Sequence, residues 1–306
     1  MCGDVEVANA DEISLDLVVA GGTEAMADSA AADSAAADSA ATYARRGFCV
    51  VENVLSAAEL ALLRREADAL HAALDTDLAA DESCVLEALP SGMPDGSVAR
   101  TSWDAYLARR AADPADRAIL QNFLERKLAG VLRATLSTDS VYLFNEHFVV
   151  KPPGAGRFAW HTDAAHQLEA VLALGGDALA EYASAWIALD DVDASNGQLL
   201  LLPWDAPQPP GARPLEPAGA AALSWLESAE AAAHVVRPTA RAGDAIVFAA
   251  TLWHASEPNA SSADRRAYYA QYSRSPIATP RGGPLHLALP APAPKKRPRA
   301  DADSPT

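Results

Sequence analysis

The sequence predicts an α+β fold in which helices pack outside a β-sandwich. Two helix-like segments come early, and short apolar or alternating runs dominate from about residue 140 onward. Turn-forming stretches such as PPGAG, DASNG and RAGD separate those runs. Helices followed by strands are the order typical of α+β proteins. The sequence lacks a glycine-rich strand-to-helix turn, which argues against a Rossmann unit.

The two ends of the chain have compositions that cannot build a core. The unit ADSAA occurs three times over residues 27–41, and its side chains are methyls, hydroxyls and carboxylates. We therefore expect residues 1–42 to be a disordered tail and residues 43–288 to form one domain. Residues 289–306 are proline-rich and then basic, which predicts a second disordered tail. Its KKRPR stretch at 295–299 resembles a nuclear-import signal and is equally consistent with a solvated charge run.

The folded region opens with a strand and a helix. The run FCVVENV at 48–54 is rich in β-branched and aromatic residues, which favour strands. Ser56 and Glu59 then have the spacing of a capping box. One apolar stripe at helical spacing follows: Leu60, Leu63, Ala67 and Leu70.

A second helical segment is expected over residues 114–136, and strands follow it. The strand-like runs are short, apolar or alternating, and bounded by turn residues. They cover residues 140–150, 184–192, 198–203, 244–255 and 267–273. This arrangement places most of the β structure in the second half of the chain.

Composition restricts the classes of partner and the compartment. The chain has 306 residues and a formal net charge of −17, so it repels phosphate groups and disfavours nucleic-acid or membrane-surface binding. Its three cysteines, Cys2, Cys49 and Cys84, lack metal-ligand spacing and are expected to be reduced thiols of an intracellular, cytoplasmic protein. No apolar run is long enough to span a bilayer, and the acidic N-terminus is unlike a signal peptide. The last residues, SPT, are not a peroxisomal address.

The stretch FAWHTDAAHQ contains the first candidate metal ligands. If it is a strand, His161 and Asp163 point to the same face and can bind one ion. A non-haem Fe(II) oxygenase needs one more histidine to complete a facial triad with open positions. Four histidines lie downstream: His166, His234, His254 and His286.

His254 is the best placed of these, because it follows the strand-like run DAIVFAATLW and precedes a polar loop. Open iron positions suit 2-oxoglutarate, whose far carboxylate requires a cation, best a guanidinium. Arg265 lies eleven residues after His254 and begins the next strand-like run, with Arg266 beside it. Alternation puts the two arginines on opposite faces, and the residues alone favour neither.

These segments resemble the phytanoyl-CoA dioxygenase family of Fe(II)- and 2-oxoglutarate-dependent oxygenases over roughly residues 43–276. The resemblance rests on GFCVVENVLSAAEL, on VVKPPGAG before the His-Thr-Asp triplet, on AWIALDDVDASNGQLLLLP and on RAGDAIVFAATLWHASEPNASSADRRAYYAQYS. The histidine-to-arginine spacing of eleven matches the family and selects Arg265. The family fold is a double-stranded β-helix (jelly roll, cupin-like) with flanking helices, which is the fold the resemblance implies here.

The resemblance also implies a set of functional residues. By it, the iron ligands would be His161, Asp163 and His254, and Arg265 would anchor the C5 carboxylate of 2-oxoglutarate. Ser256 matches a hydroxyl that assists this arginine, and Trp186 and Asn145 match positions that line the co-substrate pocket. Together, the iron ligands and Arg265 form the implied catalytic set.

The implied activity is an Fe(II)- and 2-oxoglutarate-dependent dioxygenase that uses O₂, hydroxylates a small or medium organic substrate, and releases succinate and CO₂. In related halogenases a small residue replaces the carboxylate ligand, whereas Asp163 is present here, so hydroxylation is the expected outcome. Two segments depart from the family pattern: PWDAPQPPGARP after LLLLP, and the long stretch 164–183, an expected lid. The substrate therefore does not transfer. The alternative is a catalytically silent dioxygenase fold with a binding or regulatory role.

Overall fold

The architecture comes from a computed structural model. It describes residues 37–73, 84–87, 103–165, 181–213, 215–276 and 289–290. Residues 37–46 are helical and residues 289–290 form a strand, so the inner ends of both expected tails lie in secondary structure. The rest of the tails and most of the expected lid lie outside the described residues.

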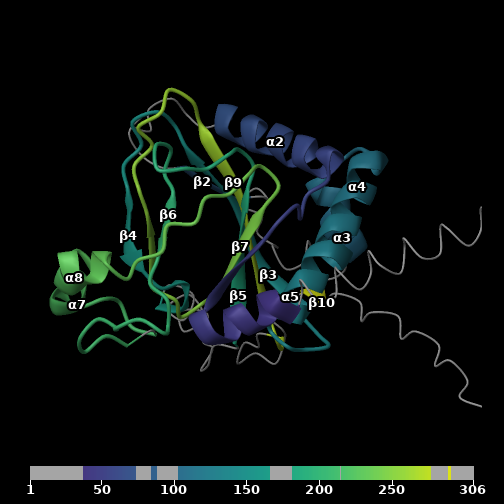
Figure 1. Ribbon diagram of the computed structural model, residues 1–306. Helices are drawn as coiled ribbons and strands as arrows, with labels where there is room; N and C mark the ends of the chain where they lie inside the picture. Colours follow the sequence, from purple (N-terminus) through teal and green to yellow (C-terminus); the bar gives the residue numbers. More distant parts are fainter. Residues whose placement is uncertain are drawn as a thin grey trace, which may run out of the picture.

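Two antiparallel sheets face each other (Figure 1). The larger sheet has the order β1 (Phe48–Val51), β7 (Ala245–Ala249), β5 (Tyr182–Ala188), β9 (Arg265–Ser273), β3 (Tyr142–Lys151) and β10 (Leu289–Pro290), with β2 (Cys84–Glu87) also paired to β3. The smaller sheet has the order β4 (Phe158–His161), β8 (His254–Ser256) and β6 (Leu199–Leu201). Every strand-like run of the sequence contributes a strand, and β2 and β10 add two that the sequence did not indicate.

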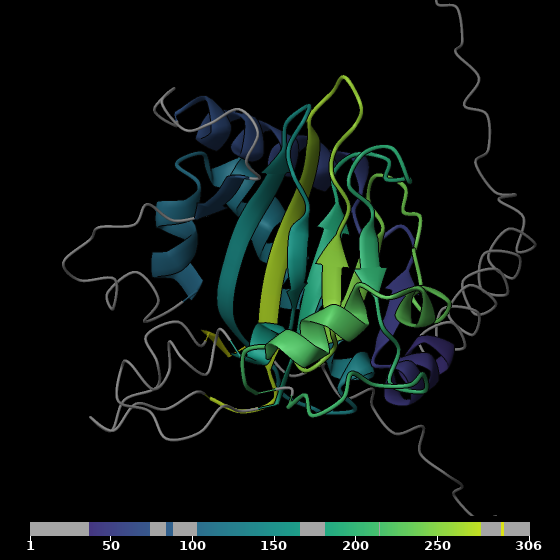
Figure 2. The same cartoon turned by 90° about the vertical axis from the view of Figure 1, so that its left-hand side faces the viewer.

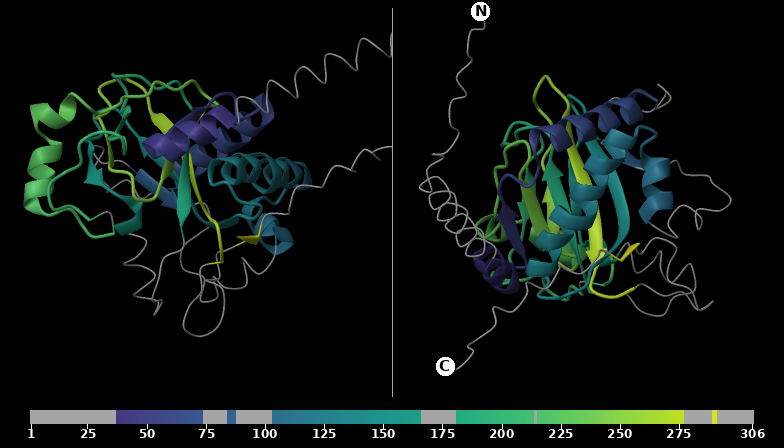
Figure 3. Two further views of the ribbon diagram at one scale, coloured as in Figure 1. Left: turned by 60° about the horizontal axis from the view of Figure 1, so that its bottom comes forward. Right: turned by 90° about the vertical axis from the view of Figure 1, so that its right-hand side faces the viewer.

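Helices cover the outer faces of both sheets, as the α+β prediction requires. The outer side of the larger sheet carries α2 (Ala57–Ala72), α3 (Trp103–Arg110), α4 (Pro114–Gln121), the π-helical η2 (Asn122–Leu128) and α5 (Ala129–Thr135) (Figure 3). Outside the smaller sheet lie α7 (Ala220–Leu226) and α8 (Ala229–Ala232) (Figure 2). The expected helix 114–136 is therefore one helical rod with a π-helical middle.

Local signals set the helix ends. Ser56 and Glu59 form the predicted capping box at the start of α2, and Lys127 of η2 also donates to Glu59 over 2.6 Å. Asp113 caps α4 by accepting a hydrogen bond from the Ala115 amide, ahead of proline at the first helical position. Of the predicted stripe, Leu63 and Ala67 are buried and Leu60 and Leu70 are partly buried, and Leu62 is buried in addition.

Strand alternation assigns opposite roles to the two faces of the larger sheet. On its outer face the buried carboxylate of Glu146 accepts hydrogen bonds from Tyr106, Tyr268 and Arg110. This cluster attaches α3 to strands β3 and β9. The side chains between these outward ones point into the space between the sheets, and on β9 they include Arg265 and Tyr269. The functional site lies in that space.

Candidate active site

Three ligating side chains converge between the sheets. His161 ends β4 and His254 begins β8, and the two residues are direct cross-strand partners. The Oδ1 atom of Asp163 lies 3.6 Å from Nε2 of His254 and 4.0 Å from Nε2 of His161. The donor atoms all lie within 4.8 Å of one another. Two ligands that each bind an ion at about 2.1 Å can be at most roughly 4.2 Å apart, so both measured separations fit one shared ion.

The local structure that brings Asp163 into this group differs from the sequence argument. The strand ends at His161, and Asp163 begins a helical segment that the structure describes over residues 163–165. The amide of Ala164 donates to the carbonyl of Ala250, which fixes this segment beside β7. The i, i+2 alternation of a strand is therefore not the cause of the convergence; the helical segment achieves it instead.

The other candidate histidines do not join the group. His234 follows α8 and is exposed, and the metal-ligating groups found among the described residues do not include it. His166 and His286 lie outside the described residues. Of the four histidines considered from the sequence, the structure therefore brings His254 to the His-Thr-Asp triplet.

Backbone carbonyls orient both imidazoles. Nδ1 of His161 lies 2.7 Å from the Ala159 carbonyl, and Nδ1 of His254 lies 3.0 Å from the Leu252 carbonyl. Because a carbonyl oxygen can only accept, each Nδ1 carries the proton and donates it. When such a ring is neutral, its Nε2 lone pair faces the centre of the group, which is the usual arrangement of a metal-binding histidine.

The far oxygen of the Asp163 carboxylate is held from the opposite sheet. Oδ2 accepts hydrogen bonds from Ser184 Oγ at 2.5 Å, from the Tyr269 hydroxyl, and from Gln271 Nε2 at 3.2 Å. Burial by itself raises the pKa of Asp163, but the charges of His254 and His161 and the hydrogen bonds from Ser184 and Tyr269 outweigh it and lower that pKa. The carboxylate thus stays ionised, with Oδ1 directed at the imidazoles and Oδ2 occupied.

The triad opens onto a cavity of about 640 Å³ that also contains Arg265 and Ser256. The Arg265 side chain is buried, and its Nη1 atom makes no hydrogen bond to any described residue. The buried Oγ of Ser256 likewise lacks a partner among the described residues. Unpaired buried donors are costly. Their presence in one cavity indicates a site for an anionic ligand.

The surroundings of Arg265 offer its guanidinium few hydrogen-bond acceptors among the described residues. Its Nε donates to the Asn196 carbonyl over 3.4 Å, a long hydrogen bond, and its Cζ lies 5.3 Å from the centre of the Trp186 ring. Burial lowers the pKa of Arg265 to about 10, so it remains charged at neutral pH. The adjacent Gly197 has φ +92°, and a Cβ there would lie 3.2 Å from Nη2 of Arg265, so the DASNG turn needs glycine to approach the guanidinium.

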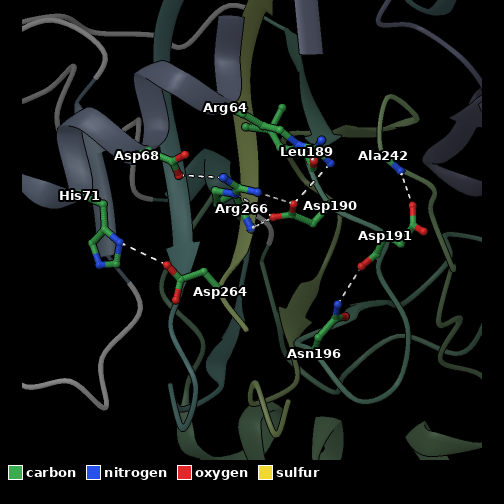
Figure 4. A network of polar contacts seen from close by, with 10 residues as sticks. All are labelled: Arg64, Asp68, His71, Leu189, Asp190, Asp191, Asn196, Ala242, Asp264 and Arg266. Carbon is green, nitrogen blue, oxygen red and sulfur yellow. Dashed lines mark hydrogen bonds and ion pairs between the residues drawn. The ribbon is translucent and has the colours of Figure 1, made fainter. Parts of the chain in front are cut away.

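Arg266 points out of the opposite face of the sheet (Figure 4). Its guanidinium forms two hydrogen bonds with Asp190 and one with Asp68 of α2. These pairs attach α2 to the end of β9 and satisfy the charge of Arg266. Of the two neighbouring arginines, Arg265 is therefore the one with an unpaired donor in the cavity.

The remaining predicted positions also line the cavity. Asn145 donates to Gln271 over 2.9 Å, so it supports Asp163 through Gln271. Trp186 stacks beside Arg265 as described above. The residues missing from the predicted set are Ser184, Tyr269 and Gln271. Strand alternation puts Tyr269 and Gln271 on the same face as Arg265, but that pattern does not indicate contact with a distant carboxylate.

The donor set suits a non-haem iron. Two imidazoles and one carboxylate on one side of a pocket form the 2-His-1-carboxylate facial arrangement, which leaves positions free for exogenous ligands. The unpaired guanidinium in the same cavity suits a carboxylate-bearing ligand. These two features together fit an iron site with a dicarboxylate co-substrate.

Solved structures of similar fold include one with bound iron and α-ketoglutarate and one with bound 2-oxoglutarate. The epimerase SnoN of nogalamycin biosynthesis, solved with Fe³⁺, α-ketoglutarate and nogalamycin RO, aligns with a TM-score of 0.58 and 20% identity over 85% of this chain and all (100%) of that one. EctD from S. alaskensis, with 2-oxoglutarate and 5-hydroxyectoine, aligns with a TM-score of 0.52 and 22% identity over 81% of this chain and 82% of that one. AviO1 from Streptomyces viridochromogenes Tue57 aligns with a TM-score of 0.51 and 21% identity over 84% of this chain and 97% of that one. The predicted double-stranded β-helix with flanking helices is confirmed.

Two further comparisons bear on the chain. No curated protein sequence matches it at a significant level. Among the described residues, no helix has both the length and the apolar character needed to cross a bilayer. The sequence model of the family described as phytanoyl-CoA dioxygenase matches residues 43–267, which is well over half of the chain. The chain belongs to the phytanoyl-CoA dioxygenase family of iron- and 2-oxoglutarate-dependent oxygenases.

Proposed function

We propose that the protein is an Fe(II)- and 2-oxoglutarate-dependent dioxygenase that hydroxylates a small or medium organic substrate. His161, Asp163 and His254 hold the iron, and Arg265 with Ser256 binds the C5 carboxylate of 2-oxoglutarate. Trp186 and Asn145 line the co-substrate part of the pocket. The compartment of the protein stays a prediction from the sequence.

One observation carries this proposal: the unpaired Nη1 of buried Arg265 shares a cavity with the His-Asp-His group. A buried guanidinium without a counter-ion is expensive in a folded protein, because the lost hydration is not replaced. A bound carboxylate removes that cost through charge-assisted hydrogen bonds. One 2-oxoglutarate molecule that binds the metal at the triad and reaches Arg265 therefore accounts for both features of the cavity.

The residues of the chain divide the task. When bound, iron and 2-oxoglutarate supply the oxidation, in which O₂ converts a substrate C–H bond to C–OH while 2-oxoglutarate becomes succinate and CO₂. Ala159 and Leu252 carbonyls hold the imidazole tautomers. Ser184 and Tyr269 hold the carboxylate. Both sheets exclude water from the deep end of the cavity, where Arg265 is buried.

Hydroxylation is supported by the presence of Asp163 as a third protein ligand. With its Oδ2 held by three donors, the carboxylate would be the third protein ligand of the iron, where the related halogenases have a small residue that makes room for halide. The structural neighbours include an epimerase, so the chemical outcome requires product analysis. A single added oxygen in the product supports hydroxylation, whereas a product of unchanged mass or one that has lost two hydrogens contradicts it.

The experiment is release of succinate from 2-oxoglutarate by the purified protein, with and without Fe(II). We expect iron-dependent succinate that is lost in His161→Ala and Asp163→Ala. His234→Ala, on the exposed loop after α8, is the matched control and should retain full turnover. Equal turnover in all variants would show that the triad does not hold the metal.

The alternative, a silent binding or regulatory protein with this fold, predicts a disrupted site. The three donor groups instead lie within 4.8 Å of one another, and the buried guanidinium is retained. The geometry of the site does not favour that alternative. An absence of succinate release in protein that binds both Fe(II) and 2-oxoglutarate would favour it.

A further inference from the structure

The cavity has a polar end and a predominantly apolar wall. Under the proposed function, on which this inference rests, the polar end is used by iron and 2-oxoglutarate. The remaining lining is mostly aliphatic or aromatic, and we call six of its members the apolar wall. They are Val85, Val149, Phe158, Leu199, Pro217 and Leu223. This wall is the surface that a substrate would contact.

Strands of both sheets and helix α7 contribute side chains to the apolar wall. Val85 and Val149 are cross-strand partners on β2 and β3, so their side chains share one face. Leu199 comes from the facing sheet, and Leu223 comes from α7 outside it. The segment leading into α7 includes PWDAPQPPGARP, one of the two segments that depart from the family pattern in sequence. Covering such a wall with an apolar ligand is favourable in proportion to the area removed from water.

The charges around the cavity disfavour an anionic substrate. Among the described residues that line it, Arg265 is the one cation, and the proposed function assigns it to 2-oxoglutarate. The nearby ammonium of Lys151 donates to the Gly156 and Glu257 carbonyls. A substrate carboxylate or phosphate would therefore lose its hydration without gaining a cationic partner. The net charge of −17 adds long-range repulsion.

The lining does not favour a cationic substrate either. Glu216, at the cavity mouth, has a side chain that is 60% exposed and pairs with Arg213 over 3.1 Å. An exposed, already paired carboxylate attracts a further cation only weakly. His147 faces the cavity and stacks on Tyr269, and burial lowers its pKa to about 4. Its neutral imidazole is suited to a hydroxyl or carbonyl group.

We propose that the substrate is a neutral, mainly hydrophobic organic molecule of medium size that carries a hydroxyl or carbonyl group, and not an acyl-CoA thioester, a phosphate ester or a free acid. The cavity volume of about 640 Å³, which iron and 2-oxoglutarate share with the substrate, lies within the range typical of pockets for drug-sized ligands. The apolar wall binds the hydrocarbon part, and His147 binds the oxygen.

Three fluorescent probes with the same ring system test the charge preference: anthracene-9-methanol, anthracene-9-carboxylate and 9-anthracenylmethylamine. Each is titrated into protein loaded with Mn(II) and 2-oxoglutarate, so that Arg265 is already occupied. The alcohol should bind at least about tenfold more tightly than either charged probe, because the wall offers the charges no partner. Tighter binding of a charged probe, or no binding of the alcohol, overturns the proposal.

A matched pair of variants tests whether the wall itself sets this preference. Leu223→Arg places a guanidinium on the wall, whereas Ser224→Arg places the same charge on the exposed side of the same helix. We expect Leu223→Arg to shift the ratio of carboxylate to alcohol affinity about tenfold or more toward the carboxylate. Ser224→Arg should leave the ratio unchanged. Equal shifts in both variants, or none in Leu223→Arg, would contradict the assignment of the wall.

A second measurement distinguishes failure of the proposed function from failure of the proposed substrate class. Calorimetry of 2-oxoglutarate binding to the Mn(II)-loaded protein is performed first, without any probe. If 2-oxoglutarate does not bind, the proposed function fails, and the carboxylate probe should then bind at Arg265. If 2-oxoglutarate binds and the carboxylate probe still has the same affinity as the alcohol probe, only the proposed substrate class is wrong.

Discussion

Replacement of Tyr269 by phenylalanine tests whether the contacts behind Asp163 set metal affinity. The Tyr269 hydroxyl, Ser184 and Gln271 all donate to Oδ2 of that carboxylate, while Oδ1 faces the two imidazoles. Tyr269→Phe removes one donor and retains the ring that stacks on His147. The carboxylate then has fewer restraints on its rotation toward or away from the metal.

The size of the effect follows from the number of donors. A hydrogen bond to a charged group contributes about 1.5–3 kcal/mol. Because Ser184 and Gln271 still hold Oδ2, we take the lower end, about 1.5 kcal/mol, which corresponds to roughly a tenfold loss of metal affinity. Loss of outer contacts of metal ligands typically weakens metal binding about 10–100-fold, so the expected value lies at the weak end of that range.

The assay is anaerobic competition for Fe(II) between the protein and a chromophoric chelator. Tyr268→Phe is the matched control, since Tyr268 is the preceding residue on β9 and its buried hydroxyl also donates to a carboxylate, Glu146, on the opposite face. That control should lower the free energy of unfolding without changing Fe(II) affinity. If Tyr269→Phe binds Fe(II) as tightly as the wild type, or if Tyr268→Phe weakens binding equally, the reasoning is refuted.

Three further changes probe the cavity and the outer face of the sheet. Arg265→Lys keeps a charge but loses the forked donor, so calorimetry with Mn(II)-loaded protein should show 2-oxoglutarate affinity at least about tenfold weaker; an unchanged affinity would exclude Arg265 as the anchor. Burial, and then repulsion by Arg265, lowers the pKa of Lys151 from 10.5 to about 7. The unfolded chain therefore holds a proton that the folded protein has lost, so the Tm of wild type relative to Lys151→Met should rise from about pH 7 to about pH 10; a falling difference would contradict that shift. Arg110→Met leaves Glu146 without its buried cation and should cost about 3 kcal/mol in urea unfolding; a loss under about 1 kcal/mol would show that the tyrosines suffice.

The sequence predicted the element types well because burial patterns are local. Continuous apolar runs and turn residues located β3, β5, β6, β7 and β9, and the Ser56–Glu59 capping box located the start of α2. Strands β2 and β10 were not indicated, since each is short and pairs only at the side of β3. Their pairing depends on a distant strand, which a local pattern does not report.

The site was only partly determined by the sequence. Residue chemistry singled out His161, Asp163 and His254, yet the strand alternation invoked for Asp163 was wrong, because a helical segment directs it inward. Likewise, alternation put Arg265 and Arg266 on opposite faces without stating which face was internal. The family resemblance selected Arg265, and the structure shows it buried in the cavity while Arg266 pairs with Asp190.

By itself the sequence determined the candidate donors, their order and the helix and strand types, because these depend on residue chemistry and short-range periodicity. The tertiary structure alone decided that Ser184, Tyr269 and Gln271 of the larger sheet meet the carboxylate that follows β4 of the smaller one. It also decided that the cavity wall is apolar and that Arg265 is the one cation among the described residues that line the cavity. Both are contacts across facing sheets, and they depend on how the sheets pack, which no spacing along a single strand encodes.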